Sequence, residues 1–195
     1  QDIPKPLLKV GNKPILETII KNFANHGFVN ITISLNYKGE MIKDYFGDGS
    51  NFGVNIDYVE ENMRLGTAGA LSLIENKPNE AFFVMNADLL TDVNFSHLLD
   101  FHSFSNSDAT MCVREYEYQV PYGVIEVEES NVTSIVEKPI QKFFVNAGIY
   151  VLSPKVFDYI PKNEFYDMPT LFNTFIEKEK NVISFPIHEY WLDIG

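Results

Sequence analysis

Helical and strand patterns alternate through the first half of the sequence, and this alternation restricts the folds that the chain can adopt. Residues 14–26 repeat apolar side chains at the spacing of one helical face, between Pro14, which suits a first helical turn, and Gly27, which suits a stop. The continuous apolar run at 81–85 is typical of a strand covered on both faces. We also expect strands at 30–35 and 53–59, and helices at 38–46, 68–75 and 95–104. This βαβα order predicts a mostly parallel sheet with right-handed crossovers.

The second half of the sequence changes to short strand patterns separated by polar turns. We expect strands at 109–114, 123–127, 132–137 and 143–152, with helices near 154–160 and 168–177. A mixed sheet or a small β-rich lobe accounts for this part. Neither an internal repeat nor a low-complexity linker interrupts the 195 residues, which favours one domain.

Composition and charge argue against several classes of function. The net charge of −12 argues against an extended nucleic-acid surface, because such surfaces carry a basic stripe. Every apolar stretch is far shorter than the roughly 20 residues of a membrane span, so we expect a soluble, cytoplasmic protein without a membrane partner. Cys112 is the only cysteine, so the chain alone can form neither a disulfide nor a cysteine-based zinc site. A polyphosphate ligand would instead require a few placed lysines and a divalent metal ion held by carboxylates.

Two aspartates beside apolar segments are candidate metal ligands. Asp88 directly follows the apolar run at 81–85, and open parallel sheets bind ligands beyond the carboxyl ends of their strands. Its carboxylate can hold a magnesium ion that bridges phosphate oxygens, or it can simply cap a turn. Asp193 lies among apolar neighbours, where a carboxylate is costly unless it is paired or metal-bound. Together the two can clamp one metal ion, whereas Asp193 alone would more often be solvated.

Two lysines have neighbours that limit the directions of their side chains. Lys5 stands between Pro4 and Pro6, and Lys138 stands between Glu137 and Pro139. An ammonium group held in this way suits a phosphate, and the carboxylate of Glu137 suits sugar hydroxyls. For either lysine alone, a solvated surface charge is the more ordinary interpretation.

Glycine-containing segments supply further candidate contacts. Leu65-Gly66-Thr67-Ala68-Gly69-Ala70 places two glycines and a capping threonine at a helix start, where a ligand can approach unpaired N–H groups. A tight loop with good helix packing explains the same residues equally well. Gly123 and Asn146 offer backbone and amide contacts that suit a sugar, although glycines in strands also mark ordinary bulges.

Taken in order, these segments resemble those of the nucleoside-diphosphate-sugar pyrophosphorylases, or sugar-1-phosphate nucleotidyltransferases. Each motif is weak alone, but the ordered set is specific and spans the chain. The nearest resemblance is to members that act as mannose-1-phosphate guanylyltransferases. The segments that carry the resemblance are Pro4-Lys5-Pro6-Leu7-Leu8, Gly11-Asn12-Lys13-Pro14, Leu65-Gly66-Thr67-Ala68-Gly69-Ala70, Asn86-Ala87-Asp88, Tyr122-Gly123-Val124, Val136-Glu137-Lys138-Pro139, Asn146-Ala147-Gly148 and Trp191-Leu192-Asp193-Ile194-Gly195.

The resemblance implies a Rossmann-like α/β fold with a mixed, mostly parallel sheet flanked by helices and a small β-rich sugar-binding lobe. It implies transfer of a nucleotidyl group from a nucleoside triphosphate (NTP) to a sugar 1-phosphate, with GTP slightly favoured and pyrophosphate released. The implied roles are Lys5 on the triphosphate, Lys138 on the sugar phosphate, Asp88 and Asp193 on Mg²⁺, Gly123, Glu137 and Asn146 in the sugar pocket, and Leu65, Gly66, Thr67 and Gly69 beside the nucleotide.

The chain also departs from the family pattern. Family members carry a strand and a Gly-rich triphosphate loop just before the Pro-Lys-Pro segment, and they continue into a helix beyond the final motif. We therefore expect a single nucleotidyltransferase domain over 1–195 that lacks this strand and loop and is truncated at its C-terminus. Whether this segment is active by itself stays open.

Two alternatives and several properties stay open at this point. The main alternative is a non-catalytic sugar-nucleotide-binding or regulatory module of the same fold. A glycosyltransferase of the related sheet type would need an Asp-x-Asp motif, a spacing that Asp88 and Asp92 lack. The base, the sugar and the oligomeric state, including a homo-oligomer, are not determined by the sequence.

Overall fold

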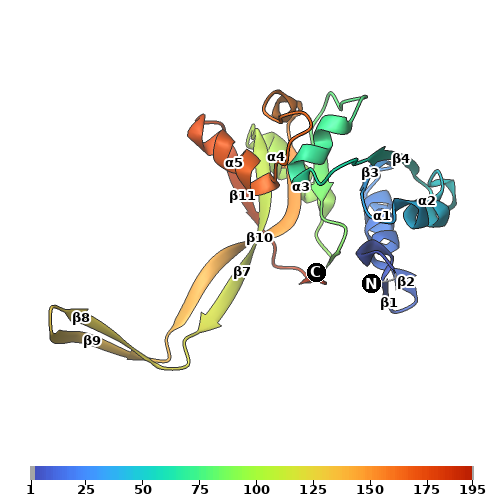
Figure 1. The fold of residues 1–195 in the computed structure, drawn as a ribbon. Helices are drawn as coiled ribbons and strands as arrows, with labels where there is room; N and C mark the ends of the chain where they lie inside the picture. The colour runs from blue at the N-terminus through green and yellow to red at the C-terminus, as the bar shows by residue number, and fades with distance from the viewer. Residues whose placement is uncertain (1–2, 195) are drawn as a thin grey trace.

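The computed structural model describes residues 3–194, which form a body and a protruding arm (Figure 1). We define the arm as residues 114–145 and the body as the other described residues. The body contains the helices and the larger sheet, whereas the arm is an antiparallel ribbon that ends in a hairpin.

Four strands form the larger sheet of the body, in the order β11-β7-β10-β5. β5 (Phe82–Met85) pairs antiparallel with the end of β10 (Ile140–Leu152), and β10 pairs antiparallel with β7 (Ala109–Gln119). β11 (Val182–Pro186) joins the other edge of β7 in parallel. The order arises because β7 and β10 are joined through the arm, so that β10 returns between β7 and β5.

Helices cover both faces of this sheet. Tyr150 and Leu152 of β10 pack with the buried side of α5 (Met168–Glu177), whereas Ile149 and Val151 pack with α4 (Phe95–Phe104). Successive residues of a strand point to opposite faces, so a continuous apolar run fills two core clusters at once.

A second, parallel pair of strands lies beside α1 (Ile15–Asn25). β3 (Asn30–Leu35) and β4 (Asn55–Glu60) are joined by the crossover helix α2 (Gly39–Phe46). Leu16 and Ile20 of α1 pack on this pair, while Phe23 of the same helix stacks on Phe95 with ring centroids 4.0 Å apart. α1 therefore joins the core of the β3–β4 pair to that of the larger sheet. Within residues 3–194 the two sheets share no strand ladder.

The remaining elements are short. They are η1 (Lys5–Leu7), β1 (Lys9–Val10), β2 (Lys13–Pro14), η2 (Ser50–Phe52), α3 (Gly66–Gly69), η3 (Ala70–Leu73), β6 (Leu89–Thr91), η4 (Pro154–Asp158) and β12 (Trp191–Asp193) in the body, with β8 (Gly123–Glu128) and β9 (Asn131–Glu137) forming the hairpin of the arm. None of the helices within 3–194 combines the length and apolar character that crossing a bilayer requires.

The mixed α/β class is confirmed, and the β-rich lobe corresponds to the arm. The balance of strand directions differs from the expected mostly parallel sheet, because only β3–β4 and β11–β7 are parallel among the described pairs. The hairpin connection from β7 to β10 causes this difference. β5 lies at an edge of the larger sheet and is half-buried, and its alternate residues pack on two different core clusters, as expected for a strand covered on both faces.

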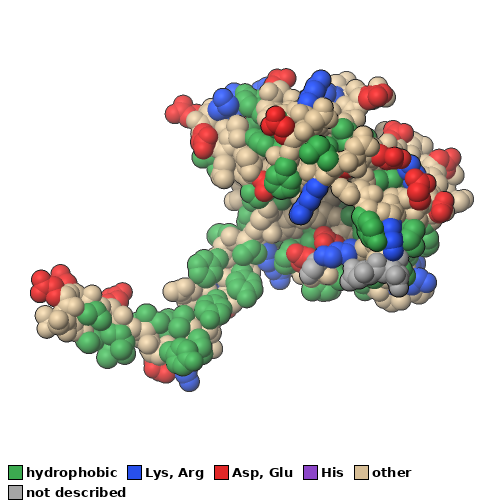
Figure 2. All heavy atoms as spheres, in the orientation of Figure 1, with side chains coloured by type: hydrophobic (Ala, Val, Ile, Leu, Met, Phe, Trp, Pro, Cys, Tyr) green, Lys and Arg blue, Asp and Glu red, His purple; other side chains and the backbone are tan. Residues whose placement is uncertain are grey.

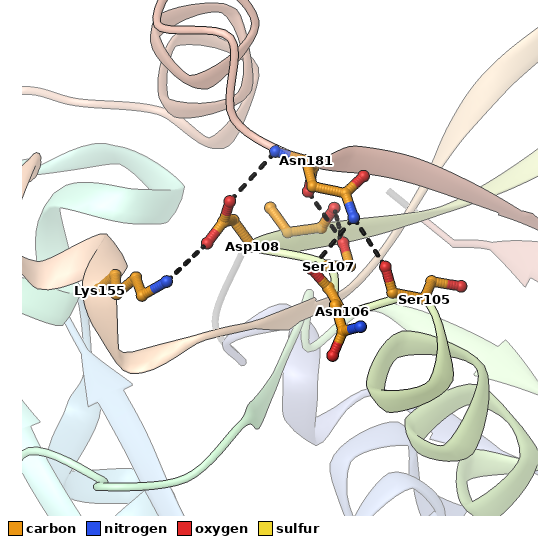
Figure 3. A network of polar contacts seen from close by, with 7 residues as sticks. Ser105, Asn106, Ser107, Asp108, Lys155 and Asn181 are labelled. Carbon is orange, nitrogen blue, oxygen red and sulfur yellow. Dashed lines mark hydrogen bonds and ion pairs between the residues drawn. The ribbon is translucent and has the colours of Figure 1, made fainter.

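A polar network joins the end of α4 to the starts of β7 and β11 (Figure 3). Asp108 accepts a hydrogen bond from the backbone N–H of Asn181 at 3.1 Å and pairs with Lys155 at 3.4 Å. The side chain of Asn181 donates to the carbonyl oxygens of Ser105 and Asn106 at 2.7 and 3.0 Å. These contacts satisfy backbone groups at a turn that lies between packed elements, so the network has a structural role.

Candidate functional site

The two candidate metal carboxylates lie on neighbouring backbone segments. β12 pairs antiparallel with β6 and places Asp193 opposite Leu89, while the backbone N–H of Ile194 donates to the carbonyl of Asp88 at 3.0 Å. The indole N–H of Trp191 donates to the carbonyl of Ala147 at 2.9 Å and fastens β12 to β10. Two segments far apart in the sequence thereby place the backbones of Asp88 and Asp193 side by side.

Carboxylates on neighbouring segments, such as these two, are groups that could hold a magnesium ion shared with a substrate. Mg²⁺ in proteins is often held by only one or two carboxylates, with water and phosphate oxygens completing its octahedral shell. Within residues 3–194, no group of three or more His, Cys, Asp or Glu side chains is placed to hold a metal ion. The donor set therefore suits a metal ion that arrives with a polyphosphate better than an all-protein metal centre.

The segment of Lys5 packs beside these carboxylates. Leu8, at the end of the Pro-Lys-Pro segment, belongs to the same apolar cluster as Leu90 and Ile194. Lys5 itself lines a cavity of about 410 Å³ together with Ile3, Pro4, Pro6 and Tyr37. The segment that contains Lys5 therefore lies in the same region of the body as the segments of Asp88 and Asp193, and both ends of the described chain lie close together there (Figure 1).

Asn146 adjoins the same region through a bulge in β10. The register between β7 and β10 shifts between Asn146 and Tyr150, and Gly148 within the bulge has a φ of 71°. A Cβ atom on Gly148 would come within 2.8 Å of the amide nitrogen of Asn86, so only glycine permits this approach. The bulge thereby rests on the segment that holds Asp88.

The Asn146 side chain is itself held within the bulge. Its amide nitrogen donates to the Tyr150 hydroxyl at 2.7 Å, and its carbonyl oxygen accepts from the backbone N–H of Gly148 at 2.9 Å. Burial raises the pKa of Tyr150, which keeps the phenol protonated at neutral pH. A sugar that used this amide would bind a side chain whose orientation is already fixed.

Two backbone N–H groups of the loop at 65–70 are paired, which differs from the expectation of unpaired N–H groups there. The backbone N–H groups of Ala68 and Gly69 both donate to the Tyr166 carbonyl, at 3.0 and 2.7 Å, and the Tyr166 N–H donates to Leu65. Thr67 does not cap its own helix, because its hydroxyl accepts from the N–H of Met168 at the start of α5. The helix begins at Gly66 rather than Ala68 and gives way to a 3-10 turn after one turn.

Packing explains both glycines of this loop. Gly66 has a φ of 80°, and a Cβ atom there would lie 2.8 Å from the Tyr166 carbonyl oxygen. A Cβ atom on Gly69 would lie 3.0 Å from the carbonyl oxygen of Glu164. The tight-loop interpretation therefore accounts for these residues, and a nucleotide contact by Leu65, Gly66, Thr67 or Gly69 stays a prediction.

Gly123, Glu137 and Lys138 lie on the arm, away from the carboxylates (Figure 1). Gly123 is directly opposite Glu137 in the hairpin, where a Cβ atom would lie 3.0 Å from a Glu137 carboxylate oxygen. Lys138 has a φ of 47°, and its N–H donates to the Tyr122 carbonyl at 3.2 Å. The structure thus brings Lys5, Asp88, Asp193 and Asn146 to one region but leaves these three residues apart from it.

Tyr37 is a further candidate, and no motif in the sequence marks it. It lines the cavity of Lys5 with 70% of its surface exposed, and the ammonium of Lys38 lies 5.2 Å from the centre of its ring. The available signal was its position just beyond the carboxyl end of β3, where ligands of open sheets bind.

The fold and this arrangement define an α/β protein with paired carboxylates and a lysine at one edge of its strands. The nucleotidyl transferase family model matches residues 1–195, and the chain belongs to this family. The chain is 36% identical over 209 residues to a mannose-1-phosphate guanyltransferase of Yarrowia lipolytica, covering 99% of this chain and 55% of that protein. It is 35% identical to a mannose-1-phosphate guanyltransferase of Saccharomyces cerevisiae, covering 99% of this chain and 56% of that protein. The chain therefore spans about half the length of these curated relatives.

Solved structures share the fold. HddC from Yersinia pseudotuberculosis superposes with a TM-score of 0.73 at 28% identity, covering 100% of this chain and 86% of that one. A putative glucose-1-phosphate thymidylyltransferase from Bacillus anthracis gives a TM-score of 0.74 at 21% identity, covering 97% and 80% of the two chains. The second likeness concerns the fold alone.

Proposed function

We propose that the protein containing this chain transfers a nucleotidyl group from a nucleoside triphosphate to a sugar 1-phosphate and releases pyrophosphate. The observation that carries the proposal is the pairing of β12 with β6, which sets Asp193 beside Asp88 next to the segment of Lys5. GTP is the proposed triphosphate, because the similar relatives are named mannose-1-phosphate guanyltransferases. A cytoplasmic location belongs to the same proposal, since its charged substrates do not cross membranes unaided.

The reaction requires positioning and charge neutralisation rather than a protein nucleophile. An oxygen of the sugar phosphate attacks the α-phosphorus in line, a new P–O bond forms, and the bond to the bridging oxygen of pyrophosphate breaks. The attacking phosphate is already ionised, so no general base is needed. Lys5 binds the triphosphate in this scheme, and Lys138 binds the sugar phosphate.

Asp88 and Asp193 are the proposed ligands of Mg²⁺, which supplies charge neutralisation at the phosphates when it is bound. Gly123, Glu137 and Asn146 are the proposed contacts of the sugar. The loop of Leu65, Gly66, Thr67 and Gly69 is the proposed nucleotide contact, with the N–H groups of Ala68 and Gly69 excluded because Tyr166 already accepts from them.

Replacing Asp88 tests this proposal directly. We expect Asp88→Ala, in the complete natural chain, to lower turnover by roughly 10²- to 10³-fold, the size of effect seen when one electrostatic contact to a transition state is lost. The measurement is pyrophosphate release from GTP and mannose 1-phosphate in the presence of Mg²⁺, with thermal melting to check the fold. Asp92→Ala is the matched control, because Asp92 is an exposed carboxylate of the same segment. A near-normal rate for Asp88→Ala would remove the proposal.

The base and the sugar require a substrate screen. Four common triphosphates are combined with several hexose 1-phosphates, and pyrophosphate release is measured for each pair. We expect the highest kcat/KM with GTP. Tight binding of a finished nucleotide sugar without turnover of any pair would instead indicate a non-catalytic module.

A further inference from the structure

Arg114 stands where β7 leaves the body and enters the arm, and its side chain reaches back to the body. It lies opposite Val145 in the ladder between β7 and β10, at the neck that Figure 2 shows as a narrow part of the molecule. The guanidinium donates to the backbone carbonyl of Glu189 at 2.5 Å and lies 3.5 Å from the carbonyl oxygen of Ile187. A charged side chain at the base of the arm is therefore bound to a backbone segment of the body.

The segment that Arg114 holds is the link 187–190 between β11 and β12, which has no regular secondary structure. The start of the link is attached to β7, because the N–H of Ile187 donates to a carbonyl of that strand at 2.8 Å. Its end is attached to β6, because the hydroxyl of Thr91 donates to the Tyr190 carbonyl at 3.0 Å. The guanidinium binds the link between these two attachments and restricts the path that the backbone takes into β12.

The position of Asp193 depends on contacts of this kind, because the strand that carries it is short. β12 is three residues long and pairs with β6 only from Trp191 to Asp193. A two-stranded pair of this length is marginally stable in water unless other contacts hold it. The indole of Trp191 supplies one such contact on β10, and the guanidinium of Arg114 supplies another just before the strand begins. Hydrogen bonds from a charged donor are stronger than those from a neutral one.

The surroundings of Arg114 differ from those of an ordinary surface charge. Arg114 lies two residues beyond Cys112 in β7, so the two side chains share the face of the sheet that α4 covers. Cys112 is fully buried on this face, Trp191 packs on the same core cluster, and Arg114 itself is half-buried. A charge at the rim of a core is costly unless its hydrogen bonds are satisfied. The backbone carbonyl of Glu189 satisfies the guanidinium here and draws the link toward the core.

We propose that Arg114 is a positioning residue, which keeps Asp193 in place to bind Mg²⁺ by holding the Glu189 carbonyl. The guanidinium touches neither substrate nor metal in this scheme and acts through the backbone that leads into β12. Arg114 is also paired in the ladder with the residue that precedes Asn146. The same side chain therefore fixes a proposed metal carboxylate relative to a proposed sugar contact. This role rests on the proposed function, whereas the attachment of the link to Arg114 does not.

Hydrogen exchange tests the attachment without any substrate. In the complete natural chain, Arg114→Met removes the charge and the donors but keeps a long side chain. We expect the backbone amides of 191–194 to exchange about 10-fold faster in Arg114→Met than in the wild type, because β12 opens more often. Lys142→Met is the matched control, since Lys142 is a cation of the same ribbon whose ion pairs lie within the arm. Equal exchange in the wild type and Arg114→Met overturns the proposal.

The Mg²⁺ requirement tests the role toward the metal ion. The measurement is the Mg²⁺ concentration that gives half-maximal pyrophosphate release from GTP and mannose 1-phosphate. We expect this concentration to rise about 10- to 100-fold in Arg114→Met, the size of effect seen when a group that orients a metal ligand is lost. Arg114→Lys should restore part of the loss, because an ammonium can still donate to one carbonyl, and Lys142→Met should leave the requirement unchanged. An unchanged requirement in Arg114→Met overturns the positioning role.

A double-mutant cycle separates action through Asp193 from a general loosening of the body. If Arg114 acts through this carboxylate, Arg114→Met should raise the Mg²⁺ requirement little further in a chain that already carries Asp193→Asn. A further rise as large as that in the wild-type background overturns the positioning role. If the wild type releases no pyrophosphate from any triphosphate, the proposed function fails and the role toward Mg²⁺ fails with it. The exchange measurement then still decides whether Arg114 holds β12 in place.

Discussion

The body and the arm share two strands, yet the same strands meet different surroundings in each. In the body, Ile149 and Leu152 of β10 are fully buried on opposite faces. In the arm, Ile140 and Phe144 of the same strand keep 56 and 69% of their exposure. An apolar strand residue in this protein therefore does not by itself indicate a core. The contribution of such a residue to the stability of the fold depends on whether a helix or a further strand covers its side chain.

Two isoleucines of β10 provide the strongest test of this comparison. We expect Ile149→Ala in the body to lower the free energy of unfolding by about 2–5 kcal/mol, because it leaves a cavity between sheet and α4. Ile140→Ala in the arm should change it by less than about 0.5 kcal/mol. Urea denaturation measures both values, and equal costs would contradict the distinction between body and arm.

Helices with local end signals were predicted most closely from the sequence. α4 and α5 begin and end where expected, because Asn94 accepts from the N–H of His97 at 3.0 Å and Asp167 accepts from Thr170 at 2.9 Å. These caps lie within three residues of their partners and are visible as local patterns. The arm was predicted too short, although the alternation of Glu and Tyr from 115 to 118 is itself a strand pattern.

The candidate site depends more strongly on contacts between distant segments. The order of motifs singled out Asp88 and Asp193, but only the pairing of β12 with β6 explains how they meet. No local pattern indicates that the Tyr166 carbonyl accepts from the loop at 65–70, so the loop looked open to a ligand. The length of the ribbon likewise separates Lys138 from the body. The order of motifs in the sequence does not predict this separation in space.

The hydrogen bonds of two hydroxyl groups, one in the body and one in the arm, should also differ in their contribution to stability. Ser107 is buried in the body, and its oxygen lies 2.8 Å from the Ala109 carbonyl and 3.1 Å from that of Asn181. We expect Ser107→Ala to cost about 1–2 kcal/mol, since a buried acceptor loses its donor. Thr133 in the arm donates to the Glu126 carbonyl at 3.2 Å but is exposed, so Thr133→Ala should cost less than about 0.5 kcal/mol. Thermal unfolding followed by circular dichroism measures both, and a larger loss in the arm would reverse the comparison.

The pH dependence of stability in the range where histidine titrates should belong to the body, because residues 114–145 contain no histidine. His102 is buried on α4, and its Nδ1 lies 2.8 Å from the Thr110 hydroxyl oxygen. Burial lowers the pKa of His102 below its ordinary value of 6.5, while nearby Asp108 partly opposes this shift. The unfolded chain therefore binds a proton more readily than the folded one, and stability is complete above pH 6.5 and declines as the pH falls below it.

We expect this decline to be the smallest of the three effects. It is measured as the change in Tm between pH 7.5 and 5.5, roughly the range in which histidine titrates. The part of the slope that comes from His102 should disappear in His102→Gln and persist in His97→Gln, because His97 is exposed on the same helix. An identical slope in wild type and His102→Gln would show that the folded body binds this proton as readily as the unfolded chain. Burial on α4 would then leave the pKa of His102 unchanged, as exposure to solvent would.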